Sequence, residues 1–283
     1  MRPNVQRPHW SYSSLNQFLK CPLQYYFERV LGLSRRTTTD AQVLGSAIHA
    51  ALAEHHGGLM DAKPISTPRI HQAFLASWSD QTSGRDVVYD KRSPDDAKDL
   101  GIALIEAYLG EPPPENIVAV EAPMLTPITD SQGEVLEKPL LAVADLIVRG
   151  SDGTPKVVEI KTAGRSFSES EVASSLQATC YASALYELTG EEPLVEYAVL
   201  VKTKTPKVQR IETIRTLADF GRLGDVAGVV ERAVEAEIFY PVESPLNCSS
   251  CPFHRECRSW TGPRLEEFGE GEIPVAEEAA LAR

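Results

Sequence analysis

The chain has 283 residues, 42% of them hydrophobic and 24% charged, which is typical of a soluble globular protein with one large domain or two small ones. No apolar run approaches the roughly 20 residues that a membrane-spanning helix needs, and the first ten residues lack the apolar stretch of a secretory signal. Five cysteines, four of them in an arrangement that suits a metal, favour a reducing compartment. We therefore expect a cytoplasmic protein.

The formal net charge of −12 is unfavourable for a protein that binds nucleic acid non-specifically. Six glutamates and one arginine follow Leu265, so this tail accounts for −5 of the charge. We expect residues 265–283 to be a disordered acidic tail behind a single domain of residues 1–264. One segment has the opposite charge, with five cations and a single acid, Glu212, and we expect it to track DNA. Its cations are Lys202, Lys204, Lys207, Arg210 and Arg215.

Helical patterns fill the first third of the chain. Residues 11–33 open with serines suited to an N-cap, and an apolar stripe follows at helical spacing. Residues 43–56 carry a second stripe, which we expect Gly57-Gly58 to end. Further helical patterns cover residues 70–78 and 95–109.

Strand patterns dominate the remainder. The order of elements from residue 117 onward is β-β-β-α-β, which predicts an α/β core with a helical insertion at about residues 50–112. The expected strands are residues 117–124, 140–148, 157–161, 194–203 and 208–214, and the expected helices are 174–188 and 217–238.

Two of these strands carry a pair of acids. Turn residues at 150–153 predict a hairpin, and if it is symmetric about Asp152, Asp145 and Glu159 face each other across the strands. Two carboxylates in that position repel, and a bridging divalent cation is the simplest way to offset the repulsion. Lys161 lies on the same face as Glu159, beside this predicted metal. An ordinary exposed hairpin with scattered charges is the alternative.

The spacing Cys248-x2-Cys251-x5-Cys257 predicts a metal site near the end of the domain. Structural zinc and iron–sulfur clusters each take four ligands, so one ligand is missing from this segment. The candidates for it are Cys21, Cys180 and His254. Cys21 lies at a helix break beside Pro22 and is the best of them, whereas Cys180 falls in the middle of a helix, where a buried thiol is the simpler interpretation.

Together these features resemble an iron–sulfur member of the RecB-type branch of the PD-(D/E)XK nuclease superfamily, the branch that includes AddB-type and CRISPR-adaptation nucleases. The resemblance runs from Ser11 to Trp260. It implies a restriction-endonuclease-like α/β core, a mixed central sheet flanked by helices, with an N-terminal helical region and a C-terminal iron–sulfur loop. The matching motifs are Ser13-x-Leu15-x2-Phe18-x2-Cys21-Pro22-x2-Tyr25-Tyr26-Phe27, Gly45-x3-His49, Glu121, Asp145, Glu159-Ile160-Lys161-Thr162, Gln177-x3-Tyr181 and the three C-terminal cysteines. The chain departs from the family in having Ala142 where a glycine is frequent and Glu159 where aspartate is frequent.

The resemblance implies a role for each matching residue. It makes His49, Asp145, Glu159 and the carbonyl of Ile160 the ligands of Mg²⁺ or Mn²⁺. Lys161 is then the catalytic lysine, which orients or deprotonates the attacking water. Gln177 and Tyr181 share one helix face and line the site, and Glu121 is an acid of less defined role on the first core strand. The ligands of the implied [4Fe–4S] cluster are Cys21, Cys248, Cys251 and Cys257.

From these residues we expect a metal-dependent deoxyribonuclease, an exonuclease on single-stranded DNA ends that works in repair, recombination or related DNA processing. Two alternatives stay open. The first is a DNA-end-binding or scaffold protein with a vestigial site, which an intact His49, Asp145, Glu159 and Lys161 set disfavours. The second keeps the enzyme and replaces the iron–sulfur cluster with structural zinc, since the cysteine spacing suits both.

Overall fold

A five-stranded mixed sheet forms the centre of the molecule. The computed structural model describes residues 8–35, 37–90 and 92–262, so the expected acidic tail at 265–283 lies outside the described residues. The strands follow one another across the sheet in chain order, and all neighbours are antiparallel except β5 and β6. The strands are β3 (Ile117–Thr126), β4 (Leu140–Arg149), β5 (Pro155–Ala163), β6 (Leu194–Val201) and β7 (Lys207–Ile214).

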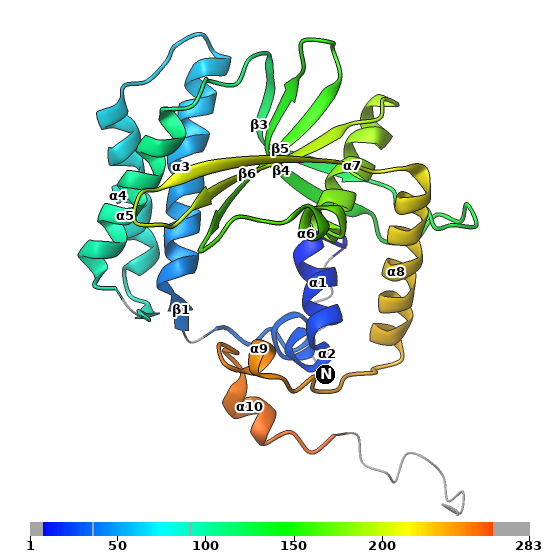
Figure 1. Cartoon of the computed structure of the whole chain (residues 1–283). Coiled ribbons are helices and arrows are strands. Elements are labelled where there is room, and N and C mark those ends of the chain that lie inside the picture. Colours follow the sequence, from blue (N-terminus) through cyan, green and yellow to red (C-terminus); the bar gives the residue numbers. More distant parts are fainter. Residues whose placement is uncertain (1–7, 36, 91, 263–283) are drawn as a thin grey trace, which may run out of the picture.

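Helices cover both faces of this sheet (Figure 1), as the expected fold class requires. The parallel pair β5–β6 needs a crossover connection, which two helices supply. The helix expected at residues 174–188 is confirmed as the second of these helices, which begins after its N-cap Ser175, and a short helix that the sequence analysis did not name precedes it. One face carries α3 (Asp40–Met60), α4 (Thr67–Thr82) and α5 (Pro94–Leu109); the other carries α1 (Tyr12–Lys20), α6 (Glu169–Ala173), α7 (Leu176–Thr189) and α8 (Leu217–Glu235).

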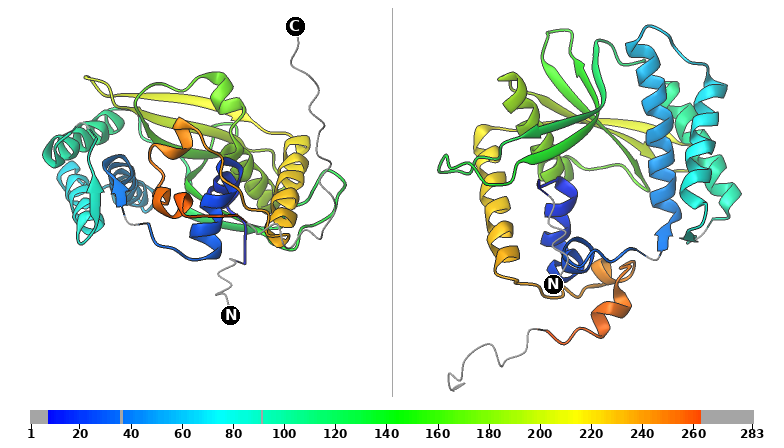
Figure 2. Two further views of the ribbon diagram at one scale, coloured as in Figure 1. Left: turned by 90° about the horizontal axis from the view of Figure 1, so that it is seen from below. Right: turned by 180° about the vertical axis from the view of Figure 1, so that it is seen from behind.

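Each helical layer buries its own hydrophobic core, and the reverse view in Figure 2 shows the two layers on opposite sides of the sheet. The first core lies under α1, α7 and α8, and the second lies under α3, α4 and α5. Alternation along β5 follows the expected strand period, because Val157 packs in the first core while Val158 and Ile160 pack in the second.

A third and much smaller core joins the two ends of the described chain. Its fully buried members are Leu23, Phe27 and Phe253, with partly buried cysteines packed around them. We call this region, residues 21–31 and 239–260, the cysteine corner. Four short helical elements build it: α2 (Pro22–Tyr25), the π-helix η1 (Tyr26–Val30), α9 (Pro245–Cys248) and α10 (His254–Arg258).

One expectation about local structure is wrong, and one pair of short strands was not expected. Helix α3 runs through Gly57-Gly58 to Met60, because Gly58 serves packing and not termination: a Cβ there would lie 2.8 Å from the carbonyl oxygen of Lys63. The region between α4 and α5 also holds a strand, β2 (Asp86–Val88), which pairs in parallel with β1 (Thr37–Thr39). In the described ranges no helix is both long and apolar enough to cross a bilayer.

Candidate active site

The β4–β5 hairpin brings the two predicted acids close together. The predicted register is confirmed along the paired part of the hairpin, from Arg149 opposite Pro155 to Leu146 opposite Val158. The pairing stops there, one residue before Asp145 and Glu159. The Asp145 carboxylate instead accepts the backbone N–H of Ile160 through Oδ2 at 2.7 Å. The expected direct opposition of the two acids is therefore wrong: the side chain of Asp145 occupies the hydrogen-bonding position that a continued ladder would use.

A kink shared by β3 and β4 turns a third acid toward Asp145. Ala142 and Ala144 face the first core, and so does Ile147, although strict alternation would place Leu146 there. The same change of face occurs in β3 at Glu121, whose φ of +47° lies in a region that residues other than glycine rarely adopt. Such strain persists only where the surroundings enforce it, and it concentrates at functional sites.

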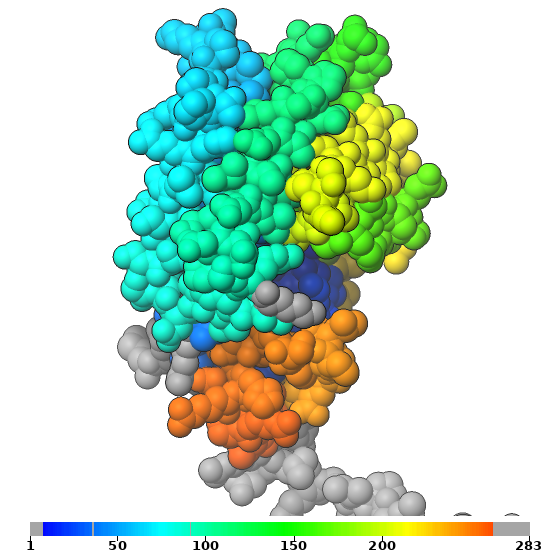
Figure 3. All heavy atoms as spheres, turned by 60° about the vertical axis from the view of Figure 1, so that its left-hand side comes forward, coloured from blue at the N-terminus to red at the C-terminus, as the bar shows by residue number. Residues whose placement is uncertain are grey.

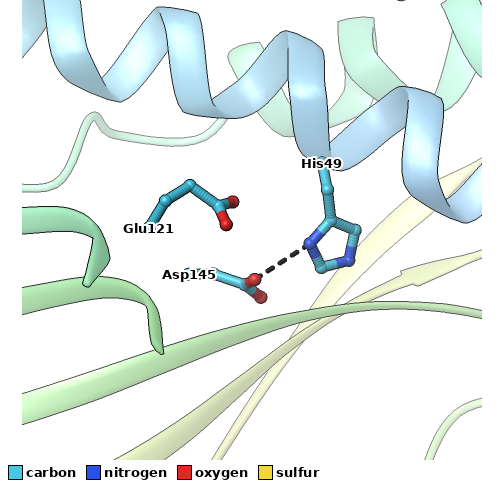
Figure 4. A group of neighbouring side chains, drawn as sticks. All are labelled: His49, Glu121 and Asp145. Atoms are coloured by element: carbon cyan, nitrogen blue, oxygen red, sulfur yellow. Dashed lines mark hydrogen bonds and ion pairs between the residues drawn. The ribbon is translucent and has the colours of Figure 1, made fainter. Parts of the chain in front are cut away.

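His49 on α3 completes a cluster of three metal-ligating side chains. One ligand atom from each of His49, Glu121 and Asp145 lies within 4.8 Å of the others, and in Figure 4 the two acids approach the imidazole from neighbouring strands. Nδ1 of His49 and Oδ1 of Asp145 are 2.9 Å apart. Among the described residues, these are the three His, Cys, Asp or Glu side chains whose ligand atoms lie close enough together to hold one ion.

Glu159 lies next to this cluster with one of its oxygens unused. Its Oε1 accepts hydrogen bonds from Lys161 Nζ at 2.5 Å and from Gln177 Nε2 at 2.9 Å. The same amide nitrogen lies 2.9 Å from the hydroxyl of Tyr181, so Gln177 and Tyr181 share one face of α7. Oε2 of Glu159 is buried and has no hydrogen-bond partner. A buried carboxylate oxygen without a partner is costly, and a cation would satisfy it.

The pKa shifts in this cluster follow from burial and from neighbouring charge. Burial raises the pKa of Glu159; the Lys161 charge opposes that rise, and the Asp145 charge adds to it. Burial works to lower the pKa of His49, but the hydrogen bond and charge of Asp145 outweigh it, so that the pKa of the imidazole is raised. The pKa of Glu121 is raised, first by burial and then by Asp145. Without a cation the cluster thus holds more negative charge than its surroundings favour.

The cysteine corner gathers the predicted sulfur ligands some way from this cluster, at the opposite end of α1. Cys21, Cys251 and Cys257 all pack against the third core, and Cys248 is close enough for its charge to raise the pKa of Cys251, after the larger effect of burial. The backbone N–H of Val242 donates to Cys21 Sγ at 3.5 Å. The other two candidates for the fourth ligand are placed differently. Cys180 is fully buried in the first core, and this burial raises its pKa to about 12. His254 lies in the cysteine corner, but its side chain is exposed.

The basic segment does not offer the five free cations that the sequence led us to expect. Arg215 is buried, and its guanidinium donates to Thr179 Oγ1 and to the carbonyl of Val172. Arg210 is paired with Glu196 across β6 and β7. Both arginines are therefore engaged within the fold, and contact with DNA stays a prediction for Lys202, Lys204 and Lys207.

One aromatic residue that the sequence did not single out faces the site. Tyr12 begins α1, and the charges of Lys161 and Glu159 both act on its hydroxyl, whose pKa is raised mainly by burial. Its position directly before the Ser13-x-Leu15 motif was the available signal, but no spacing rule links that position to Lys161.

Comparison with known proteins places this geometry in a family. The sequence model of the PD-(D/E)XK nuclease superfamily matches residues 9–258. The fold is similar to that of the "Putative exonuclease" from Eubacterium rectale, with a TM-score of 0.56 at 12% identity and 94% of each chain covered. A second solved structure, SSO0001, is 15% identical and covers 87% of this chain and 94% of its own, but its TM-score is only 0.34. No curated protein matches the chain significantly. The match over nearly the whole described chain means that this protein belongs to the PD-(D/E)XK nuclease superfamily.

Proposed function

We propose that this protein is a divalent-cation-dependent deoxyribonuclease of the RecB type that removes nucleotides from single-stranded DNA ends during repair, recombination or related processing. The observation that carries the proposal is the convergence of His49, Glu121 and Asp145 beside Glu159, whose free oxygen is buried, and Lys161. The word exonuclease in the description of the Eubacterium rectale protein supports action at ends.

The donor set fits Mg²⁺ or Mn²⁺. Carboxylate oxygens are the preferred ligands of both ions, and an imidazole is better tolerated by Mn²⁺. His49, Asp145 and Glu159 would hold the ion, with Glu121 beside them and the carbonyl of Ile160 completing the set. When bound, the ion offsets the negative charge of the scissile phosphate and promotes attack by water.

The remaining residues position and charge the site. Lys161 is held against Glu159, so its ammonium lies where it can stabilise negative charge that develops on the phosphate or donate a hydrogen bond that orients the attacking water. The side-chain amide of Gln177 on α7 donates to Glu159 Oε1 and to the Tyr181 hydroxyl, and so holds both groups in position. Preorganised donors of this kind need no rearrangement during the reaction, which is why they contribute to its rate.

An end-labelled DNA assay with matched lysine variants tests the function. Wild-type protein should shorten single-stranded DNA in Mg²⁺ or Mn²⁺, leave blunt duplex largely intact, and do nothing in EDTA. Lys161→Met should abolish cleavage. Lys156→Met is the control: this lysine lies on the same strand but pairs with Glu196 and Glu212, away from the cluster. Full activity in Lys161→Met, or equal loss in both variants, would contradict the assigned role.

For the cysteine corner we propose a [4Fe–4S] cluster held by Cys21, Cys248, Cys251 and Cys257. The preference for this cluster rests on the resemblance of the chain to iron–sulfur nucleases of the RecB type. The donor set is suitable because four thiolates are the usual complement. The hydrogen bond from Val242 to Cys21 Sγ and the aromatic packing of Phe27 against Phe253 supply a shielded environment for sulfur. Structural zinc remains the competing occupant, and metal analysis separates the two.

A further inference from the structure

A polar groove runs along α1, from Tyr12 at its start to the cysteine corner at its end. Its volume is about 370 Å³, in the range of pockets that hold small ligands and far too small for a duplex. One wall is α1 and the segment after it, and the other includes residues 246–247 and 250–252. Figure 3 shows the dark blue N-terminal segment recessed between the cyan and teal helices and the orange C-terminal segment.

The charge of this groove is opposite to that of the chain. Three cations line it, Lys20, Arg29 and Arg35, and no carboxylate does, although the whole chain has a formal net charge of −12. Lys20 and Arg35 are exposed. Arg35 is paired with Glu28, which lies outside the lining and leaves the guanidinium partly accessible. A polar groove whose charged lining residues are all cations favours a polyanion.

Two side chains in the lining suit bases and not phosphates. Tyr12 lies at the active-site end, where the charge of Lys161 acts on its hydroxyl. Leu246 lies in the opposite wall and is 91% exposed, more than any other large hydrophobic side chain among the described residues. Cations that follow a backbone, combined with apolar surfaces on which bases rest, are the chemistry of single-strand binding.

The groove is aligned with the metal-ligating cluster. Gln42 lines it from α3, and His49 lies seven residues later on the same helix, which is two turns along the same face. Helix α1, from Tyr12 to Lys20, is about 12 Å long at 1.5 Å per residue, which is long enough to accompany a short stretch of an extended single strand.

We infer that this groove binds a short stretch of a single DNA strand that leads to the active site, with Lys20 and Arg35 on the phosphates and Tyr12 and Leu246 against the bases. The inference deepens the proposed nuclease function by assigning a strand-binding site.

Binding measured without cleavage tests the inference separately from the nuclease activity. Fluorescence anisotropy with labelled oligo-dT in EDTA, over a series of salt concentrations, gives both the affinity and the number of phosphate contacts. Lys20→Gln/Arg35→Gln should weaken binding roughly tenfold or more at low salt and reduce the salt slope by about 1.4, since each contact with a single strand contributes about 0.7. Lys63→Gln/Arg69→Gln makes the same change in charge at the other end of α3, where Arg69 also pairs with a glutamate, and should bind as wild type does.

Base contacts have their own variants. Tyr12→Ala should weaken binding roughly tenfold while Tyr12→Phe stays near wild type, as expected for stacking. Leu246→Ser should weaken binding severalfold, and because this side chain is almost fully exposed, its loss cannot unfold the protein.

Each outcome has a definite meaning. If the groove variants bind oligo-dT as tightly as the Lys63→Gln/Arg69→Gln control, or if the wild type does not bind it, the groove is not a strand site. Equal effects on binding of thymidine monophosphate and of oligo-dT would make it a mononucleotide site, which also overturns the inference. Groove-dependent binding without any cleavage would instead retain the groove and refute the proposed nuclease function.

Discussion

The active site and the cysteine corner are held together by different means. The site residues come from α3, α7 and three strands, each anchored by one of two large hydrophobic cores. The cysteine corner has only short helical elements, and its own core contains three buried hydrophobic residues. So small a core contributes little free energy of folding. The site is therefore held in place by the two large cores, whereas the cysteine corner lacks such a core, and the cluster proposed on its four cysteines would link its two segments.

The largest expected effect separates chemistry from stability at the active site. Asp145→Asn should reduce cleavage at least about a thousandfold, because it removes a charged ligand while an amide oxygen can still accept from Ile160. The Tm without metal should stay within a few degrees of wild type. Titration with Mn²⁺ should raise the Tm of the wild type and not of the variant, since an ion that binds only the folded state stabilises it. Equal Mn²⁺ shifts in both proteins would place the ion elsewhere.

The cysteine corner should respond in the opposite way, in stability first. Cys21→Ala and Cys257→Ala should each lose the metal and lower the Tm by about 5 °C, roughly 3 kcal/mol for a chain of this size. Cys180→Ala, a buried cysteine in the first core, is the matched control and should keep the metal. Iron, sulfide and zinc analysis of anaerobically purified protein identifies the occupant. Stoichiometric zinc without sulfide would refute the cluster.

A pH dependence should arise in the second core, from a histidine that takes no part in the site. His56 is 1% exposed, its Nε2 lies 2.9 Å from the Tyr108 hydroxyl, and burial lowers its pKa to about 3. Above pH 6.5 the residue is neutral whether the chain is folded or unfolded. Below that value only the unfolded state takes up the proton, so stability is lost as the pH falls from 6.5 toward 3. At pH 5 the loss is about 2 kcal/mol.

The variant His56→Gln cannot take up that proton. Urea unfolding at pH 7.5 and pH 5 should therefore show a smaller pH effect in this variant than in the wild type. An identical pH effect in both proteins would show that His56 does not titrate on unfolding.

The smallest expected effect concerns the strained acid. Glu121→Gly should raise the free energy of unfolding by about 1 kcal/mol in metal-free buffer, because glycine adopts a φ of +47° without strain. The same change should reduce the stabilisation by Mn²⁺. Calorimetry with and without Mn²⁺ measures the stability and its increase on metal binding. A lower stability of Glu121→Gly in metal-free buffer would show that the backbone at Glu121 is not strained.

The sequence predicted the fold better than the details of the site. The hairpin register followed from turn residues and strand period, and Ser11 caps α1 with its side chain as the serine pattern indicated. The kink at Glu121 and Asp145 could not be foreseen, because a positive φ at a glutamate is enforced by neighbours distant in sequence. The same holds for Arg215: its burial depends on carbonyls at the end of α6, which no local pattern reveals. Local chemistry predicts elements; it does not predict which side chains tertiary packing removes from solvent.

The way the two ends of the chain meet has a consequence for synthesis on the ribosome. The backbone N–H of Leu23 donates to Tyr240 O at 3.0 Å, and Asn247 Nδ2 donates to the carbonyl of Lys20 across 227 residues. At about 5–20 residues per second, some 10–50 s separate the emergence of these partners. During this time residues 21–31 have been synthesised but cannot yet form their contacts with residues 239–260. Nascent chains arrested before Tyr240 should therefore be cut by protease within residues 21–31 while the central sheet is already protected.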